Sequence, residues 1–130
     1  MDGVGMAETE KVTVNMNVVD LGKVDLLVEQ GFYPNRTDFI KTSIRNQLTS
    51  HSSVIENVIT VKSYEIGIYY YDRKTLEQVL EQNKLLDIKV VGMLVLKDDV
   101  DVELARKTIK SIKVLGVFRA SHELKIALKK

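Results

Sequence analysis

Polar and apolar residues alternate in the segment KVTVNMN at 11–17. Successive side chains of a strand point to opposite faces, so one face would carry Val12, Val14 and Met16. The other face would carry Lys11, Thr13, Asn15 and Asn17. An Asn amide can pair in bidentate fashion with adenine, and a Thr side chain can hydrogen-bond to a base or touch a thymine methyl group. A two-stranded ribbon with such a face fits the DNA major groove, and the alternative is an ordinary amphipathic edge strand.

Two short helices are expected to hold this strand in place. The first runs from about Val19 to Gln30 and stops at Gly31, a residue suited to the left-handed turn that ends helices. After the turn, Asn35 is the expected N-cap of a second helix, with Asp38 in its first turn. The buried stripe of this second helix consists of Phe39, Ile40, Ile44 and Leu48. About forty residues cannot form a core alone, so we expect two copies to interlock through an antiparallel ribbon over a shared four-helix core.

The order strand, helix, turn, helix, with NRTDFI followed by SIRNQL in the second helix, resembles a ribbon-helix-helix DNA-binding domain, a regulator class that includes the CopG, Arc and MetJ types. The resemblance covers the chain to about residue 53 and implies that the outward strand residues read bases. The implied base contacts are Thr13, Asn15 and Asn17. It also implies that the start of the second helix holds a DNA phosphate. The implied backbone contacts are Lys11 at the ribbon's rim, Asn35, Arg36 and Thr37, although a simple capped turn would explain the last three.

Charge supports nucleic-acid binding only weakly. The formal net charge is +1, and residues 11–53 contain five basic and four acidic side chains. No broad basic stripe follows from this, so we expect modest nonspecific affinity for double-stranded DNA and a shallow dependence on salt. The absence of cysteine excludes disulfides and thiolate metal sites. No secretory signal is visible and the longest apolar run, 90–96, is too short to span a bilayer, so we expect a cytoplasmic protein without membrane contact.

Beyond the expected junction at 51–53, through which the second helix could also continue toward Ile55, the pattern changes to alternating strands and helices. We expect strands at Val58–Tyr71, Lys89–Leu96 and Val114–Phe118. Helices are expected at about Arg73–Leu86, from a start at Asp98–Glu103, and after Ser121. Asp72 and Ser121 are the expected caps, and Val102, Ala105, Ile109 and Ile112 the expected stripe of the middle helix. The sequence therefore predicts the order β-α-β-α-β-α.

The expected fold class is α+β. A disordered arm, 1–10, precedes the ribbon-helix-helix dimerisation and DNA-binding domain, 11–53, and a small α/β module, 54–130, follows it. The module is similar in architecture to the ferredoxin-like regulatory domain of nickel-responsive repressors, although no clear strand lies between Leu96 and Asp101. Their metal site needs several histidines and a cysteine, whereas this chain has only His51 and His122. We therefore expect no nickel site, no other metal and no cofactor.

Two other clusters have simpler explanations than a site. The carboxylates of Asp98, Asp99, Asp101 and Glu103 are explained by helix capping and the helix dipole. The side chains of Tyr64, Tyr69, Tyr70 and Tyr71 are explained by sheet packing rather than a ligand pocket. His122 has no nucleophile near it in the sequence, and no phosphate-binding or dinucleotide motif occurs, so we expect no enzyme.

The resulting functional hypothesis is a homo-oligomeric, sequence-specific transcriptional repressor. It would act as a dimer or, through its second module, as a tetramer, and the module would fix the assembly or sense a small-molecule or protein effector. One alternative is an antitoxin that also represses its own gene, although its tail would then be extended rather than folded. The other is an interaction or scaffold protein whose ribbon never meets DNA.

Overall fold

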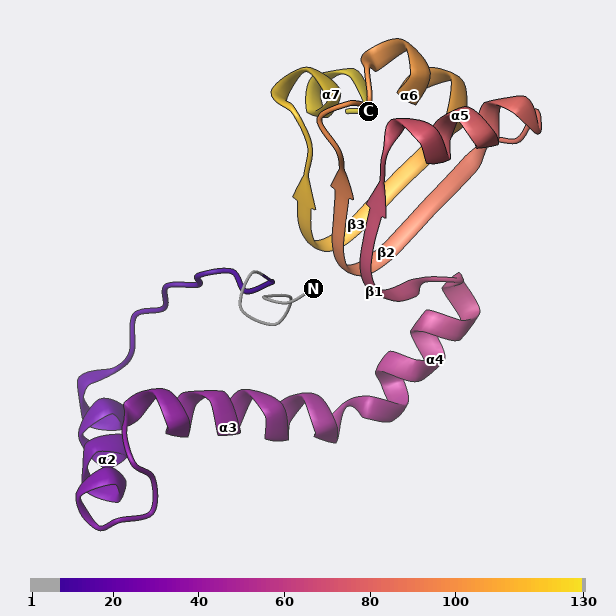
Figure 1. Ribbon diagram of the computed structural model, residues 1–130. Coiled ribbons are helices and arrows are strands. Elements are labelled where there is room, and N and C mark those ends of the chain that lie inside the picture. Colours follow the sequence, from indigo (N-terminus) through magenta and orange to yellow (C-terminus); the bar gives the residue numbers. More distant parts are fainter. Residues whose placement is uncertain (1–7, 130) are drawn as a thin grey trace. The chain divides into compact units, whose positions relative to one another are not determined.

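The computed structural model describes residues 8–129 and divides them into two compact units (Figure 1). One unit comprises Thr9–Asn57, and the other comprises 58–129 together with Glu8. The division falls inside a helix, a little beyond the predicted junction at 51–53. The assignment of separate tasks to two domains stays a prediction. The predicted disordered arm lies, for residues 1–7, outside the described residues.

The first unit contains the two predicted helices. Helix α2 spans Val18–Glu29 and helix α3 spans Arg36–Ser50, so both helices and the N-cap at Asn35 are confirmed. Gly31 ends α2 in the left-handed region, at φ 87°, and its N–H donates to the Val28 carbonyl. None of the described helices is long and apolar enough to cross a membrane.

A third helix, α4, spans Ser52–Lys62 and was not predicted. The predicted strand from Val58 to Tyr71 is therefore wrong in its first part, and β1 spans only Glu65–Tyr71. The run of β-branched residues at 58–61 suggested a strand, but these residues continue a helix that has already begun at Ser52. Ser63, at φ 59°, ends the helix, and the Tyr64 N–H closes its last turn on the Ile59 carbonyl.

The second unit is a three-stranded parallel sheet with three helices, in the predicted order β-α-β-α-β-α. After β1 come α5 (Arg73–Glu81), β2 (Leu86–Leu96), α6 (Val102–Thr108), β3 (Ile109–Arg119) and α7 (His122–Ala127). The strands lie in the order β1-β2-β3. A ferredoxin-like sheet has antiparallel strands, so that variant of the prediction is wrong. Helix α5 is also shorter than predicted, and Ile109 and Ile112 belong to β3 rather than to a helical stripe.

All three helices pack on one face of this sheet, as Figure 1 shows. Leu76 of α5, Leu104 of α6 and Leu124 of α7 are buried in one cluster with alternate residues of β2. The β2 residues of this cluster are Ile88, Val90, Leu94 and Leu96. Because the second unit has its own core, it is an independently packed module rather than an extended tail.

The opposite face of the sheet is apolar, and none of α5, α6 and α7 packs on it. Ile66 and Ile68 of β1 and Leu115 of β3 are exposed there, with Ile66 at 60%. They pair in register with β2 residues that share this face. Parallel sheets are almost always covered on both faces, so this surface, which we call the free face, is expected to meet a partner.

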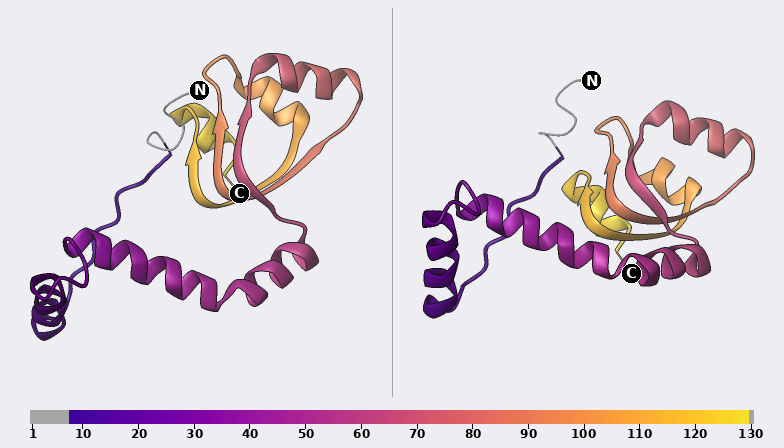
Figure 2. Two further views of the ribbon diagram at one scale, coloured as in Figure 1. Left: turned by 60° about the horizontal axis from the view of Figure 1, so that its bottom comes forward. Right: turned by 90° about the horizontal axis from the view of Figure 1, so that it is seen from below.

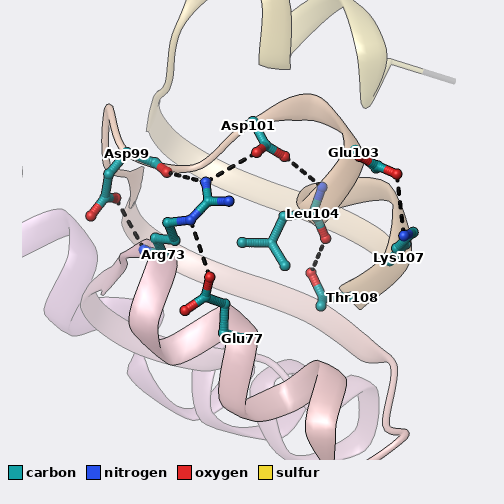
Figure 3. Close-up of polar contacts among 8 residues, drawn as sticks. All are labelled: Arg73, Glu77, Asp99, Asp101, Glu103, Leu104, Lys107 and Thr108. Carbon is teal, nitrogen blue, oxygen red and sulfur yellow. Dashed lines mark hydrogen bonds and ion pairs between the residues drawn. The ribbon is translucent and has the colours of Figure 1, made fainter.

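Loop contacts fix the carboxyl ends of β1 and β2 (Figure 3). Arg73, the first residue of α5, donates to the Asp99 carbonyl and the Asp101 carboxylate, each at 3.0 Å. Asp101 also caps α6 by accepting from the Leu104 N–H, and Asp99 accepts from the Arg73 N–H. The hydrogen bond from Leu104, followed by that from Arg73, lowers the pKa of Asp101. These carboxylates therefore act in capping and loop fixation, and the described residues contain no cluster arranged to hold a metal ion.

Three glycines lie side by side across the sheet, whose strands are curved (Figure 2). Gly67, Gly92 and Gly116 are paired in register, and their φ angles are 146°, 136° and 125°. A Cβ atom on Gly92 would lie 2.2 Å from the Gly67 carbonyl oxygen, and one on Gly116 would lie 2.1 Å from that of Gly92. The backbone conformation thus favours glycine at all three positions, and the space between strands also requires it at Gly92 and Gly116.

We predict that Gly92→Ala destabilises the protein by at least about 2 kcal/mol, because the added methyl group combines backbone strain with a clash against a hydrogen-bonded strand. The matched control is Gly22→Ala in α2, where a Cβ atom meets nothing within 4 Å. Replacing a helical glycine should stabilise the protein by about 0.5–1 kcal/mol. Urea unfolding followed by circular dichroism measures both. Equal effects of the two substitutions would contradict the structural role of the row.

Candidate nucleic-acid interface

The first unit buries almost none of its apolar side chains within a single chain. In 9–57 only Val24 is buried. Exposed apolar residues occur in the amino-terminal segment, both helices and the turn, with Val12 at 80% and Phe32 at 70%. The others include Val14, Leu26, Ile40, Ile44 and Leu48. Three residues of the predicted buried stripe are thus exposed in one chain, as expected if a second copy covers them.

The segment at 11–17 is fully exposed and forms no strand in the single chain. A strand needs a neighbour for its backbone hydrogen bonds, and the predicted ribbon would take that neighbour from the second copy. The ribbon therefore stays a prediction. Both faces of the alternating pattern are accessible, the polar face with Thr13 and Asn15 as well as the apolar face with Val14.

Asn17 has a structural task in addition to the one predicted for it. Its side-chain Oδ1 accepts hydrogen bonds from the Val19 N–H at 2.8 Å and the Asp20 N–H at 3.2 Å, which makes it the N-cap of α2. A bidentate pair with adenine uses both the oxygen and the nitrogen of the amide. Asn17 cannot form that pair while it caps the helix, so Thr13 and Asn15 are the better candidates for reading bases.

Three of the four predicted DNA-backbone contacts lie at the start of α3, and the fourth, Lys11, is exposed in the amino-terminal segment. Asn35 caps the helix, since its Oδ1 accepts from the Asp38 N–H at 2.8 Å. This bond satisfies one of the unpaired N–H groups of the first turn, and the N–H groups of Arg36 and Thr37 precede it. Both residues are exposed. A helix start of this kind can hold a phosphate through its N–H groups and dipole, irrespective of side chains.

Arg36 is not available as an isolated cation, and sequence reasoning missed its partner. Its Nε and Nη2 atoms donate to the two carboxylate oxygens of Asp25 in α2, both at 2.8 Å. This bidentate pair holds α2 and the start of α3 together and neutralises the charge that was predicted to meet the DNA backbone. The eleven-residue separation lies outside the spacing at which pairs on one helix can be recognised.

The turn between the helices is fixed from both sides. The Phe32 N–H donates to the Leu27 carbonyl at the end of α2. On the other side, the Tyr33 ring packs edge-to-face against Phe39 of α3, with centroids 5.1 Å apart. These contacts present the α3 start in one orientation relative to α2, which is what a positioning contact to a phosphate requires.

The profile of the Ribbon-Helix-Helix transcriptional regulator family matches residues 7–125. The match includes both compact units and more than half of the chain. Comparison with curated proteins gave no match, and neither did comparison with solved structures.

We predict that the Arg36 pair makes the first unit sensitive to acid. The hydrogen bonds from Arg36 hold the pKa of Asp25 below its ordinary value. A lowered folded-state pKa stabilises the fold above about pH 4, and the contribution is lost as the pH falls through that pKa. In Arg36→Gln the pKa of Asp25 should return to its ordinary value, as followed by NMR titration of the carboxyl group. Lys41→Gln is the control, and an unchanged Asp25 titration in Arg36→Gln would rule out the pairing.

Proposed function

The chain belongs to the ribbon-helix-helix transcriptional regulator family, and on this premise we propose that it is a repressor that reads the DNA major groove with a ribbon formed by 11–17 of two copies. Regulators of this family bind DNA, typically as dimers. The observation that carries the proposal is the first unit's exposed apolar surface. A second copy that covers this surface also supplies the missing ribbon strand.

The geometry of the first unit supports a division of tasks between the ribbon and the start of α3. The ribbon's polar face would provide Thr13 and Asn15 for base edges, with Lys11 at its rim. The α3 start at Asn35, Arg36 and Thr37 would fix the register by contacts to the DNA backbone through its N–H groups. Because Arg36 is paired with Asp25, its contribution to nonspecific affinity should be smaller than that of an unpaired arginine.

The folded second unit favours this proposal over the antitoxin alternative. An antitoxin tail would order on its toxin, whereas the second unit has a buried cluster of ten residues from one sheet, three helices and the loop before α6. The near-neutral net charge leaves the scaffold alternative open, but it does not argue against DNA binding by a local surface such as the proposed ribbon.

We further propose that the second unit joins two dimers into a tetramer through the free face of its sheet. The face presents Ile66, Ile68 and Leu115 to solvent. Sheet-on-sheet packing of two such faces would cover both, as the parallel arrangement requires. A tetramer would engage two pairs of operator half-sites and gain apparent affinity from the second engagement.

We predict that Asn15→Ala lowers discrimination at one base pair by about 1–3 kcal/mol, because it removes a bidentate contact to a base. Arg36→Ala should weaken binding to all sequences by similar factors. The measurement is fluorescence anisotropy with a selected operator and with each single-base variant of it, at fixed salt. An Asn15→Ala protein with the specificity of the wild type would show that the strand does not read the DNA.

We predict that two charged substitutions disrupt different steps of assembly, and light scattering of the full chain measures both. Ile44→Asp places an unpaired charge in the shared core of the dimer and should cost several kcal/mol, with loss of dimer and DNA binding. Leu115→Asp, on the free face, should leave dimers that still bind one operator site. Wild-type protein that is strictly dimeric, with the same mass as Leu115→Asp, would exclude the tetramer but not the DNA-binding proposal.

A further inference from the structure

The helix-covered side of the sheet opens into a cavity at the β3 edge. Its volume is about 500 Å³, against about 280 and 170 Å³ for two further cavities. The cavity is lined by Ser111, Ile112, Phe118, Lys125, Leu128 and Lys129. These residues come from β3 and from the last helix and the residues that follow it.

The cavity is a consequence of the strand curvature and the topology. Ile112 precedes Gly116 and Phe118 follows it, so the two side chains come from the two limbs of the curved strand. Both face the helices as part of the same apolar cluster. β3 is an edge strand, and α7, which ends at Ala127, is too short to close the opening.

The lining combines apolar side chains with two cations. Ile112, Phe118 and Leu128 provide the apolar surface, and the ammonium group of Lys125 lies 6.0 Å from the Phe118 ring centroid. Lys129 is the second cation, and no carboxylate is among the lining residues. The hydroxyl of Ser111 already donates to the Asp87 carboxylate, so the two lysines are the groups of the lining that would attract an anion.

Two further cavities lack this combination. The one beside Arg73 has both of its cations paired, since Arg73 contacts Glu77 and Asp101 and Lys107 contacts Glu103. The one at the carboxyl ends of β2 and β3 is lined by Asp98 as well as by Lys97 and is smaller. Ligand sites of proteins are typically apolar hollows of about 300–1,000 Å³ with a few converging polar groups, and of these three the cavity at the β3 edge has this character.

We propose that the cavity at the β3 edge binds an organic acid with an apolar body, namely a carboxylate carried on an aliphatic chain or an aromatic ring. The carboxylate lies at Lys125 and Lys129, and the apolar body packs against Phe118 and Leu128. This binding depends only on the second unit. Control of DNA binding by the acid would rest in addition on the proposed function, and a binding measurement without DNA keeps the two apart.

The test uses titration calorimetry of the full chain with octanoate and with octan-1-ol, which has the same chain length but no charge. Octanoate should bind once per chain, and octan-1-ol should bind more weakly. Lys125→Gln combined with Lys129→Gln should weaken octanoate binding by roughly three- to tenfold, the range for solvent-accessible ion pairs. Lys74→Gln combined with Lys84→Gln removes the same charge away from the cavity and should leave octanoate binding unchanged.

A second pair of variants tests the location of the site. The chain contains no tryptophan, so a single introduced one reports on its own surroundings. Leu128→Trp should fill the cavity and abolish octanoate binding, with circular dichroism to verify the fold. Ile126→Trp, two residues away in α7 at a position 61% exposed, should retain it. The proposal is overturned by the absence of octanoate binding at millimolar concentration, by equal binding of octan-1-ol, or by binding that survives in Leu128→Trp.

Discussion

The constraint on which the whole assembly depends is that the first unit of a single chain has almost nothing to bury. Two helices and an extended segment enclose Val24 alone, and their remaining apolar side chains face solvent. If two copies pair as proposed, folding of this unit includes the free energy of association, and its free energy of unfolding depends on protein concentration. DNA binding by the proposed ribbon would depend on concentration in the same way, because the ribbon forms only when two copies pair.

The second unit meets the opposite condition. It has a core of its own on one side of its sheet. In the glycine row the strands lie so close that a Cβ atom on Gly92 or Gly116 would clash with the backbone of the neighbouring strand. The same sheet leaves an apolar outer face exposed and borders a cavity at its β3 edge. The proposed assembly surface and the proposed ligand cavity thus both belong to the second unit.

Sequence reasoning succeeded where side chains act on the backbone next to them. Asn35, Asp72 and Ser121 were recognised as caps because each accepts a hydrogen bond from an N–H three residues away. The order of strands and helices in the second unit followed from the same local signals.

Reasoning failed where distant residues decide the structure. The helical state of 58–61 depends on a helix begun at Ser52, and the pairing of Arg36 with Asp25 depends on how α2 meets α3. Alternation alone also could not show that Asn17 caps α2, because the same residue satisfies the strand pattern and the cap. The glycine row requires the register between strands, which no single segment contains.

The strand order β1-β2-β3 has a consequence for how the protein is made. Each strand docks beside the one synthesised before it, through a crossover helix of at most nine residues, so the second unit can grow along its sheet as the chain emerges. In the proposed dimer the first unit, although synthesised earlier, completes its core only when it pairs with a second copy. Refolding should consequently show a fast phase that is independent of concentration, followed by a bimolecular phase. The part of the chain that is translated first is the last to reach its native state.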